Sequence, residues 1–300
     1  MPRDWINCIV ATADLWFLEN IIDYAGIFPP AALSPSVALE QYRAYRSGVE
    51  DWILGSLAWS CNTLSDLGSL LTPNDEVELA LIGRPSTTWD SWQDARLQDV
   101  EDVNMLLEKC PGAAAATYES RIDDLSHVTD AMNSLRSLGK ETDIYIELPW
   151  DQPIDDALAE LAAEEWVRVK FRTGGKTKDA YPSPVQLASI LKQCIDLEIE
   201  FKLTAGLHAP IAHLDKQGVL SHGFLSVLFA TSLAFQDDAS VNEMAEVLDA
   251  QDPSLWSLKK GLSYAGKTLS EEELNNARSF FSSFGSCSIE EPLAGLQRLQ

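Results

Sequence analysis

The stretches 166-WVRVKFRTGG-175 and 200-EFKLTAGLH-208 decide the fold of this chain, because each is a short apolar run that carries a lysine. In both runs apolar residues alternate with charged or polar ones, so each predicted strand has one apolar face and one polar face. An ammonium group within a strand must lose its water unless the side chain faces a polar cavity. Lys170 and Lys202 are therefore the residues that most need an explanation.

The segment between the two lysine runs predicts a helix. The sequence 183-SPVQLASILKQCIDL-197 is amphipathic, with Ser183 as its cap and Pro184 at its first helical position. Since both lysine runs end in turns that contain glycine, the three segments predict a parallel strand–helix–strand unit.

The same alternation of strands and helices is predicted before this unit. Five more strands are predicted in 21-IIDYAGIF-28, 51-DWILGSLAW-59, 77-VELALIGR-84, 113-AAAATYES-120 and 143-DIYIELPW-150. Helices are predicted between them at about 35–46, 64–71, 90–109, 125–138 and 154–165, and an N-terminal segment is expected to close the bottom of the fold. Strict alternation of apolar strands and helices is typical of a parallel sheet covered by helices.

After His208 the regular alternation of strands and helices ends. Helices are predicted at 223–235 and 241–250, a small insertion at 255–270, a helix capped by Ser270 at 271–281, and an eighth strand with a turn at 282–288. Eight strands favour a (β/α)₈ barrel, one domain over 1–300, with an extra segment at 237–270 between strands seven and eight. The alternative is an open doubly wound sheet, but no GxGxxG fingerprint follows the first strand.

Composition narrows the classes of partner. Lys and Arg number 22 against 46 Asp and Glu, a formal charge of −24 that would repel nucleic acid and anionic membranes. We therefore expect neither as a partner. We expect a small-molecule substrate, and an anionic one would require the few cations to gather at the site. A homo-oligomer is compatible with the sequence.

The cysteines and the apolar segments indicate the compartment. Five scattered cysteines without ligand spacing fit reduced thiols and a cytoplasmic protein; they are Cys8, Cys61, Cys110, Cys194 and Cys287. Acidic and amide residues interrupt the first twenty residues, so we expect no signal peptide. No segment approaches the roughly 18 uninterrupted apolar residues of a membrane span.

In such a barrel the carboxyl ends of the strands form the active face. That face would gather Asp23, Glu119, Glu147, Lys170, Arg172, Lys202, Thr204 and His208. A lysine beside a second cation in a dry pocket loses its proton more easily and becomes a nucleophile for a carbonyl group. Arg172 and Lys202 would bias Lys170 in this way. Glu147 would either relay protons to the carbinolamine or hold the lysines charged and inert.

Several motifs point to a family. Lys170-Phe171-Arg172-Thr173-Gly174 fits the pattern K-x-x-T-G, and Lys202-Leu203-Thr204-Ala205-Gly206-Leu207-His208 fits a lysine followed by small residues, glycine, an aliphatic and a basic residue. With "IIDYAGIF", "IYIELP" and Phe284-Gly285-Ser286-Cys287-Ser288, they make the chain resemble the deoxyribose-phosphate aldolase group of class I aldolases. The resemblance implies a lyase with a Schiff base on Lys170 and a substrate phosphate held near the last strand.

The resemblance and the motifs together assign roles. We expect Lys170, Lys202, Glu147 and Asp23 to be catalytic, the last two as proton relays. Substrate contacts are expected from Arg172, Thr173, Thr204, His208 and Glu119. Backbone N–H groups near helix N-termini suit a phosphate, which nominates Gly174, Gly175, Gly206, Gly285 and Ser286, although turn glycine is the commoner role.

Two departures from the family pattern keep other functions open. The family's proton-relay aspartate on a middle strand has no counterpart, because the third and fourth strands offer only Glu78 and Glu119. The segment 237–270 is additional. The alternatives are a barrel that only binds a metabolite or a partner, and a phosphosugar isomerase or transferase whose lysines act as charged electrophiles.

Three histidines raise the question of a metal. His208, His213 and His222 lack carboxylates at helical ligand spacing, so we expect no metal and no cofactor, and His208 is a better candidate for a substrate contact.

Overall fold

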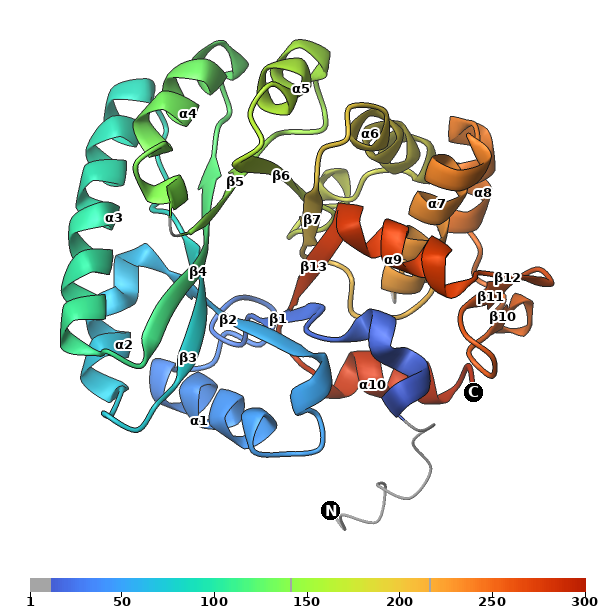
Figure 1. Ribbon diagram of the computed structural model, residues 1–300, viewed down its shortest axis with the longest axis horizontal. Coiled ribbons are helices and arrows are strands. Elements are labelled where there is room, and N and C mark those ends of the chain that lie inside the picture. Colours follow the sequence, from blue (N-terminus) through green and yellow to red (C-terminus); the bar gives the residue numbers. More distant parts are fainter. Residues whose placement is uncertain (1–11, 141, 216) are drawn as a thin grey trace.

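The computed structural model describes residues 12–140, 142–215 and 217–300. Within them, eight parallel strands close into a barrel in the order β1-β13-β7-β6-β5-β4-β3-β2, and helices surround it (Figure 1). The predicted (β/α)₈ barrel is confirmed. The part of the predicted N-terminal segment before Thr12, with Cys8, lies outside the described residues, and Thr12–Leu18 forms a 3₁₀ helix that contacts the helix before the last strand.

The barrel strands lie where the apolar runs predicted them. They are β1 (Ile22–Tyr24), β2 (Leu54–Ser60), β3 (Val77–Ile82), β4 (Ala113–Arg121), β5 (Asp143–Glu147), β6 (Val167–Arg172), β7 (Phe201–Thr204) and β13 (Phe281–Ser286). The last strand, β13, closes the barrel between β1 and β7.

The predicted helices begin within a few residues of their predicted starts, and the last helix, after the eighth strand, had no predicted bounds. They are α1 (Pro35–Arg46), α2 (Leu64–Leu70), α3 (Trp89–Lys109), α4 (Val128–Leu135), α5 (Asp155–Ala162), α6 (Pro184–Asp196), α7 (Phe224–Asp237), α8 (Val241–Leu248), α9 (Glu271–Phe280) and α10 (Glu290–Gln297). Capping boxes hold the starts of α6 and α9, because Ser183 and Ser270 accept bonds from N–H groups three residues on. Among the described helices, none joins sufficient length to sufficient apolar character to cross a bilayer.

The predicted extra segment, 237–270, follows helix α7 and contributes one helix, α8, and a small sheet. α7 is apolar on all sides because it is buried between the barrel and α8 and α9, and α8 packs on α6 and α7. Beyond α8, three short strands, β10 (Trp256–Ser257), β11 (Ser263–Tyr264) and β12 (Lys267–Thr268), form a small antiparallel sheet. Trp256 and Tyr264 pack edge-on against Phe229 of α7, which fixes this sheet to the barrel.

The strand register sets up the site. Lys170 lies opposite Lys202 on the next strand, and Glu147 lies opposite Lys170 on the strand before. The register between β3 and β4 shifts by one residue near Ala115, which leaves an extra residue in β4 before Glu119. At the amino end of the barrel the Tyr145 hydroxyl donates to Glu200 at 2.8 Å and lies 2.9 Å from the Ser282 hydroxyl, so side chains fill the barrel below the lysines.

Candidate functional site

A buried network of ion pairs crosses the barrel interior. It consists of Asp23, Glu119, Glu147, Lys170 and Lys202, and we call it the ion network. The Lys170 Nζ atom lies 2.5 Å from Glu119 Oε2 and 2.7 Å from Glu147 Oε2. The Lys202 Nζ atom lies 2.6 Å from Glu119 Oε1 and 2.6 Å from Asp23 Oδ2. Glu119 thus joins the two ammonium groups, one on each carboxylate oxygen.

The outer oxygens of the ion network are also bonded. Asp23 Oδ1 accepts from the Ser56 backbone N–H at 3.0 Å, and Asp23 Oδ2 accepts from the Ser283 hydroxyl at 2.8 Å. Glu147 Oε1 accepts from Arg121 Nη1 at 2.9 Å. The five side chains of the network are only 1–7% exposed, whereas Arg121 is half-exposed at the barrel mouth. Arg121 is therefore the link between the network and solvent.

The charges in the ion network nearly balance. Three carboxylates face two ammonium groups, and the guanidinium of Arg121 offsets the remaining negative charge. Buried charges that are paired and fully hydrogen-bonded are the arrangement that a low-dielectric interior tolerates.

The lysines are held in their charged form. Burial acts to lower the pKa of Lys170, but the charges of Glu119 and Glu147 outweigh it and raise that pKa. The pKa of Lys202 is raised in the same way, by Asp23 and Glu119 against burial. The expectation that a neighbouring cation lowers the pKa of Lys170 is therefore wrong for this state, because a carboxylate stands between the two amines.

The carboxylates respond in the opposite sense. Burial alone would raise the pKa of Glu119, yet Lys170 and Lys202 lower it to about 2. The pKa of Glu147 is also lowered, against the effect of burial, chiefly by Lys170 and then by Arg172 and Arg121. Both carboxylates are thus ionised proton acceptors beside ammonium donors.

Above the ion network the mouth carries the other predicted substrate contacts. Arg172 ends β6 and is exposed; it acts on Glu147 through its charge and forms no ion pair with the described carboxylates. Thr204 ends β7 opposite Arg172, and its buried hydroxyl has no hydrogen-bond partner within the described chain. The exposed Arg172 guanidinium is accessible to a ligand, whereas the Thr204 hydroxyl is buried and unpaired; the role of both as substrate contacts stays a prediction.

His208 lies farther round the rim. Its Nδ1 atom is 3.3 Å from the Ser286 hydroxyl and 3.4 Å from Glu291 Oε2, and burial lowers its pKa. The Ser286 hydroxyl donates to the Ser288 carbonyl at 2.6 Å, so its proton is already used within the turn.

The turn after β6 is locked to the turn after β7. The Thr173 hydroxyl donates to the Ala205 carbonyl at 2.6 Å, and the Thr173 N–H donates to the Thr204 carbonyl at 2.8 Å. Gly206 has a φ of +88°, and a Cβ on it would lie 2.8 Å from the Thr173 carbonyl oxygen. Backbone packing therefore explains Thr173 and Gly206 without a bound ligand.

The residues predicted to bind a phosphate lie partly in acidic surroundings. Gly285 lies within β13, opposite Asp23, rather than in a turn. The following helix, α10, begins with Glu290 and Glu291, whose charges already complement its N-terminus. Gly174 is buried against Gly206, and Gly175 is exposed. The turn after β13 thus offers a phosphate a negative neighbourhood.

The histidines do not gather with carboxylates into a ligand set. Across the described ranges, no group of three or more His, Cys, Asp or Glu side chains has the geometry to hold a metal ion. His222 is fully buried and its Nε2 atom contacts the Pro182 carbonyl at 2.7 Å, which indicates a structural role.

Sequence reasoning missed two features of the site. Arg121 was not nominated, although it follows Glu119 by two residues and so shares its face of β4. Glu119 was expected only to contact substrate, yet it is the carboxylate on a middle strand that touches both lysines.

Comparison with known protein families, curated proteins and solved structures finds no match for this chain. Its function has to be inferred from the ion network itself.

Proposed function

We propose that this barrel is a lyase of class I aldolase type, which acts on a small phosphorylated or acidic carbonyl compound through a Schiff base on Lys170. The observation that carries the proposal is the bridge of Glu119 between two buried ammonium groups. Positioned carboxylates at hydrogen-bond distance from an amine are the groups that move its proton during catalysis.

The first step is loss of a proton from Lys170. Its ammonium passes a proton to Glu147 Oε2, 2.7 Å away, and the free amine attacks the carbonyl carbon of the substrate. The carbinolamine forms when the alkoxide oxygen takes up the second amine proton. Glu147 then returns its proton to the hydroxyl group, which leaves as water, so that an iminium ion remains and Glu147 is again ionised.

The second step is cleavage of a carbon–carbon bond. Glu119, as an ionised carboxylate, accepts the proton of the substrate's β-hydroxyl group while the bond electrons move into the iminium, which gives an aldehyde and an enamine. Protonation of the enamine carbon by Glu119 and hydrolysis of the iminium release the second product. Lys202 stays charged, since it donates to both Asp23 and Glu119, and it holds Glu119 in place.

Lys170 is the better nucleophile of the two by position. It lies between the carboxylate linked to the mouth, Glu147, and the inner carboxylate, Glu119. The Lys202 side chain is only 1% exposed, and its Nζ atom lies 5.2 Å from the centroid of the Tyr145 ring, deeper in the barrel.

Trapping with borohydride tests the proposal. Wild-type protein is incubated with candidate aldehydes and keto acids, reduced, and digested for mass spectrometry. We expect a reduced adduct on Lys170, and none there in Lys170→Met. The exposed Lys259 serves as a control for non-specific labelling. Adducts no more frequent at Lys170 than at Lys259 would contradict the Schiff base.

One observation favours a second function. The raised pKa of both lysines suits an isomerase or transferase in which the ammonium groups stabilise negative charge on the substrate and form no covalent bond. Lys170→Arg separates the two functions, because a guanidinium keeps the charge but forms no Schiff base. Turnover retained in Lys170→Arg would favour the electrophilic role, and ligand binding without turnover in wild type would favour a binding protein.

A further inference from the structure

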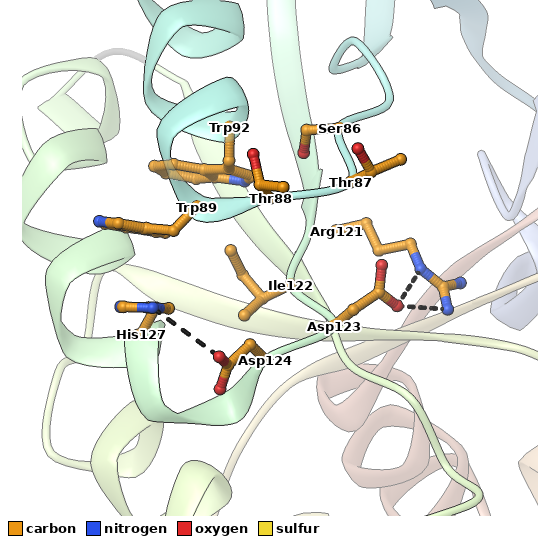
Figure 2. A pocket seen from close by; sticks show the side chains of 10 residues that line it. All are labelled: Ser86, Thr87, Thr88, Trp89, Trp92, Arg121, Ile122, Asp123, Asp124 and His127. Atoms are coloured by element: carbon orange, nitrogen blue, oxygen red, sulfur yellow. Dashed lines mark hydrogen bonds and ion pairs between the residues drawn. The ribbon is translucent and has the colours of Figure 1, made fainter.

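A pocket lies beside the barrel mouth, between the loops that follow β3 and β4 (Figure 2). Its volume is about 140 Å³, which is the space of about five water molecules. Residues 86–89 and Trp92 line one side, and residues 121–124 and His127 line the other. None of these side chains was nominated by the sequence.

Stacked rings form one wall of the pocket. Trp89 lies between Trp92, at a centroid distance of 4.8 Å, and His127, at 4.3 Å, with all three rings nearly parallel. Figure 2 shows this column edge-on, with Ile122 and Asp123 across from it. Because both faces of Trp89 are covered, this ring offers only its edge to the pocket.

Arg121 joins the pocket to the ion network. Its Nε atom donates to Asp123 Oδ1 at 2.7 Å, while its Nη1 atom donates to Glu147 Oε1 at 2.9 Å. Glu147 in turn contacts Lys170 Nζ at 2.7 Å. Two side chains, Arg121 and Glu147, thus connect the pocket to the reactive amine.

The remaining polar groups of the pocket define what it recognises. The hydroxyl groups of Ser86 and Thr87 form no hydrogen bond with another described side chain or carbonyl, and Asp124 uses Oδ1 for Ser126 while Oδ2 lies 3.8 Å from His127. These groups suit a ligand that both donates and accepts hydrogen bonds.

Charge excludes an anion at this position. Arg121 is already bound by two carboxylates, and Asp123 and Asp124 make the lining negative. A phosphate would have to displace a carboxylate from Arg121 in a protein of net charge −24. A neutral ligand meets no such cost.

We propose that this pocket is a subsite for a neutral polyhydroxylated chain, the end of the substrate that lies away from the carbonyl carbon. The inference rests on the proposed function for the link to Lys170, but the binding itself does not require the chemistry. Ser86 and Thr87 hydrogen-bond the ligand hydroxyl groups, Asp124 Oδ2 accepts from them, and the ring edges limit the length of the chain.

Erythritol is the probe, because it carries four hydroxyl groups and no carbonyl and so cannot form a Schiff base. Its dissociation constant is measured by saturation-transfer NMR titration. We expect saturable binding that Ser86→Phe, which fills the pocket, and Thr87→Val, which removes one hydroxyl group, each weaken about tenfold. Ser254→Phe, at an exposed position outside the pocket, is the matched control and leaves the dissociation constant unchanged.

Charged analogues test the class of ligand. Erythronate, an anion, is expected to bind more weakly than erythritol, because Asp123 and Asp124 make the lining negative. Tighter binding of erythronate or of 2-amino-1,3-propanediol, a cation, or erythritol binding that Ser86→Phe leaves intact, overturns the proposal. If erythritol behaves as expected while borohydride traps no adduct, the proposed lyase fails and the subsite stands. If Lys170 is trapped but Ser86→Phe does not change the dissociation constant of erythritol, only the subsite proposal fails.

Discussion

Replacing Glu119 by Gln is the most direct test of the ion network. The change keeps the shape of the side chain but removes the charge that both lysines share. Each lysine keeps one other carboxylate, Glu147 or Asp23, and the amide oxygen of Gln accepts a bond from only one of them. The amide N–H₂ group then faces the other ammonium, which leaves a buried charge poorly paired.

The size of the effect follows from that geometry. Breaking a buried pair by removing one partner costs about 3–5 kcal/mol, and because each lysine retains a partner we expect the lower end, about 3 kcal/mol in the free energy of unfolding. For a chain of 300 residues that corresponds to a fall in Tm of roughly 5 °C. Urea unfolding at pH 7, followed by circular dichroism, measures it. Glu78→Gln is the matched control, since Glu78 is an exposed carboxylate on β3 and should change stability by no more than about 0.5 kcal/mol.

Acid gives an independent measure of the same carboxylate. The folded pKa of Glu119 is about 2, below its ordinary 4.5, so its contribution to stability is present above about pH 4.5 and is lost as the pH falls through about 2. The stability difference between wild type and Glu119→Gln should therefore shrink over that window. Equal losses for Glu119→Gln and Glu78→Gln at pH 7, or a difference that does not change with acid, would refute the reasoning.

Two further predictions concern the mouth and the rim. Arg172→Gln should raise KM about tenfold for an acidic carbonyl substrate and change it little for a neutral one, because the exposed guanidinium forms no ion pair with the described carboxylates. Steady-state kinetics measures both KM values. Equal effects on the two substrates would argue against anion binding by Arg172. Gly206→Ala should lower the free energy of unfolding by about 2 kcal/mol, measured by urea unfolding, since it adds a clash with the Thr173 carbonyl to the strain of positive φ. Gly218→Ala has a similar φ of +74° with open space around it, and should cost only about 1 kcal/mol; equal costs would mean that the clash is relieved.

Much of the architecture was predictable because the apolar pattern and the helix caps are local signals. The alternation in 166–172 placed β6, and Ser183 and Ser270 marked the starts of α6 and α9. The convergence of Lys170 and Lys202 followed from the barrel itself, since neighbouring parallel strands bring equivalent positions together.

The electrostatics of the site were not predictable in the same way. β4 is an alanine-rich strand with an extra residue near Ala115, so its sequence placed Glu119 on the active face but did not show that its carboxylate lies between the two lysines. Arg172 and Lys202 were expected to lower the pKa of Lys170, whereas Glu119 and Glu147 raise it. Long-range contacts between β4 and β6 decide whether the pKa of Lys170 is raised or lowered, and no local sequence pattern predicts these contacts.

The bonds between Thr173 and residues 204 and 205 have a consequence for engineering. They join β6 to β7 just past the ends of both strands, and Gly174 packs on Gly206 at the same level. The barrel backbone, which lies below these bonds, thus sets the spacing of the two amines. The exposed residues 176–179 follow these bonds in the chain, so this loop can be shortened, lengthened or exchanged to accept other ligands while the amines keep their separation.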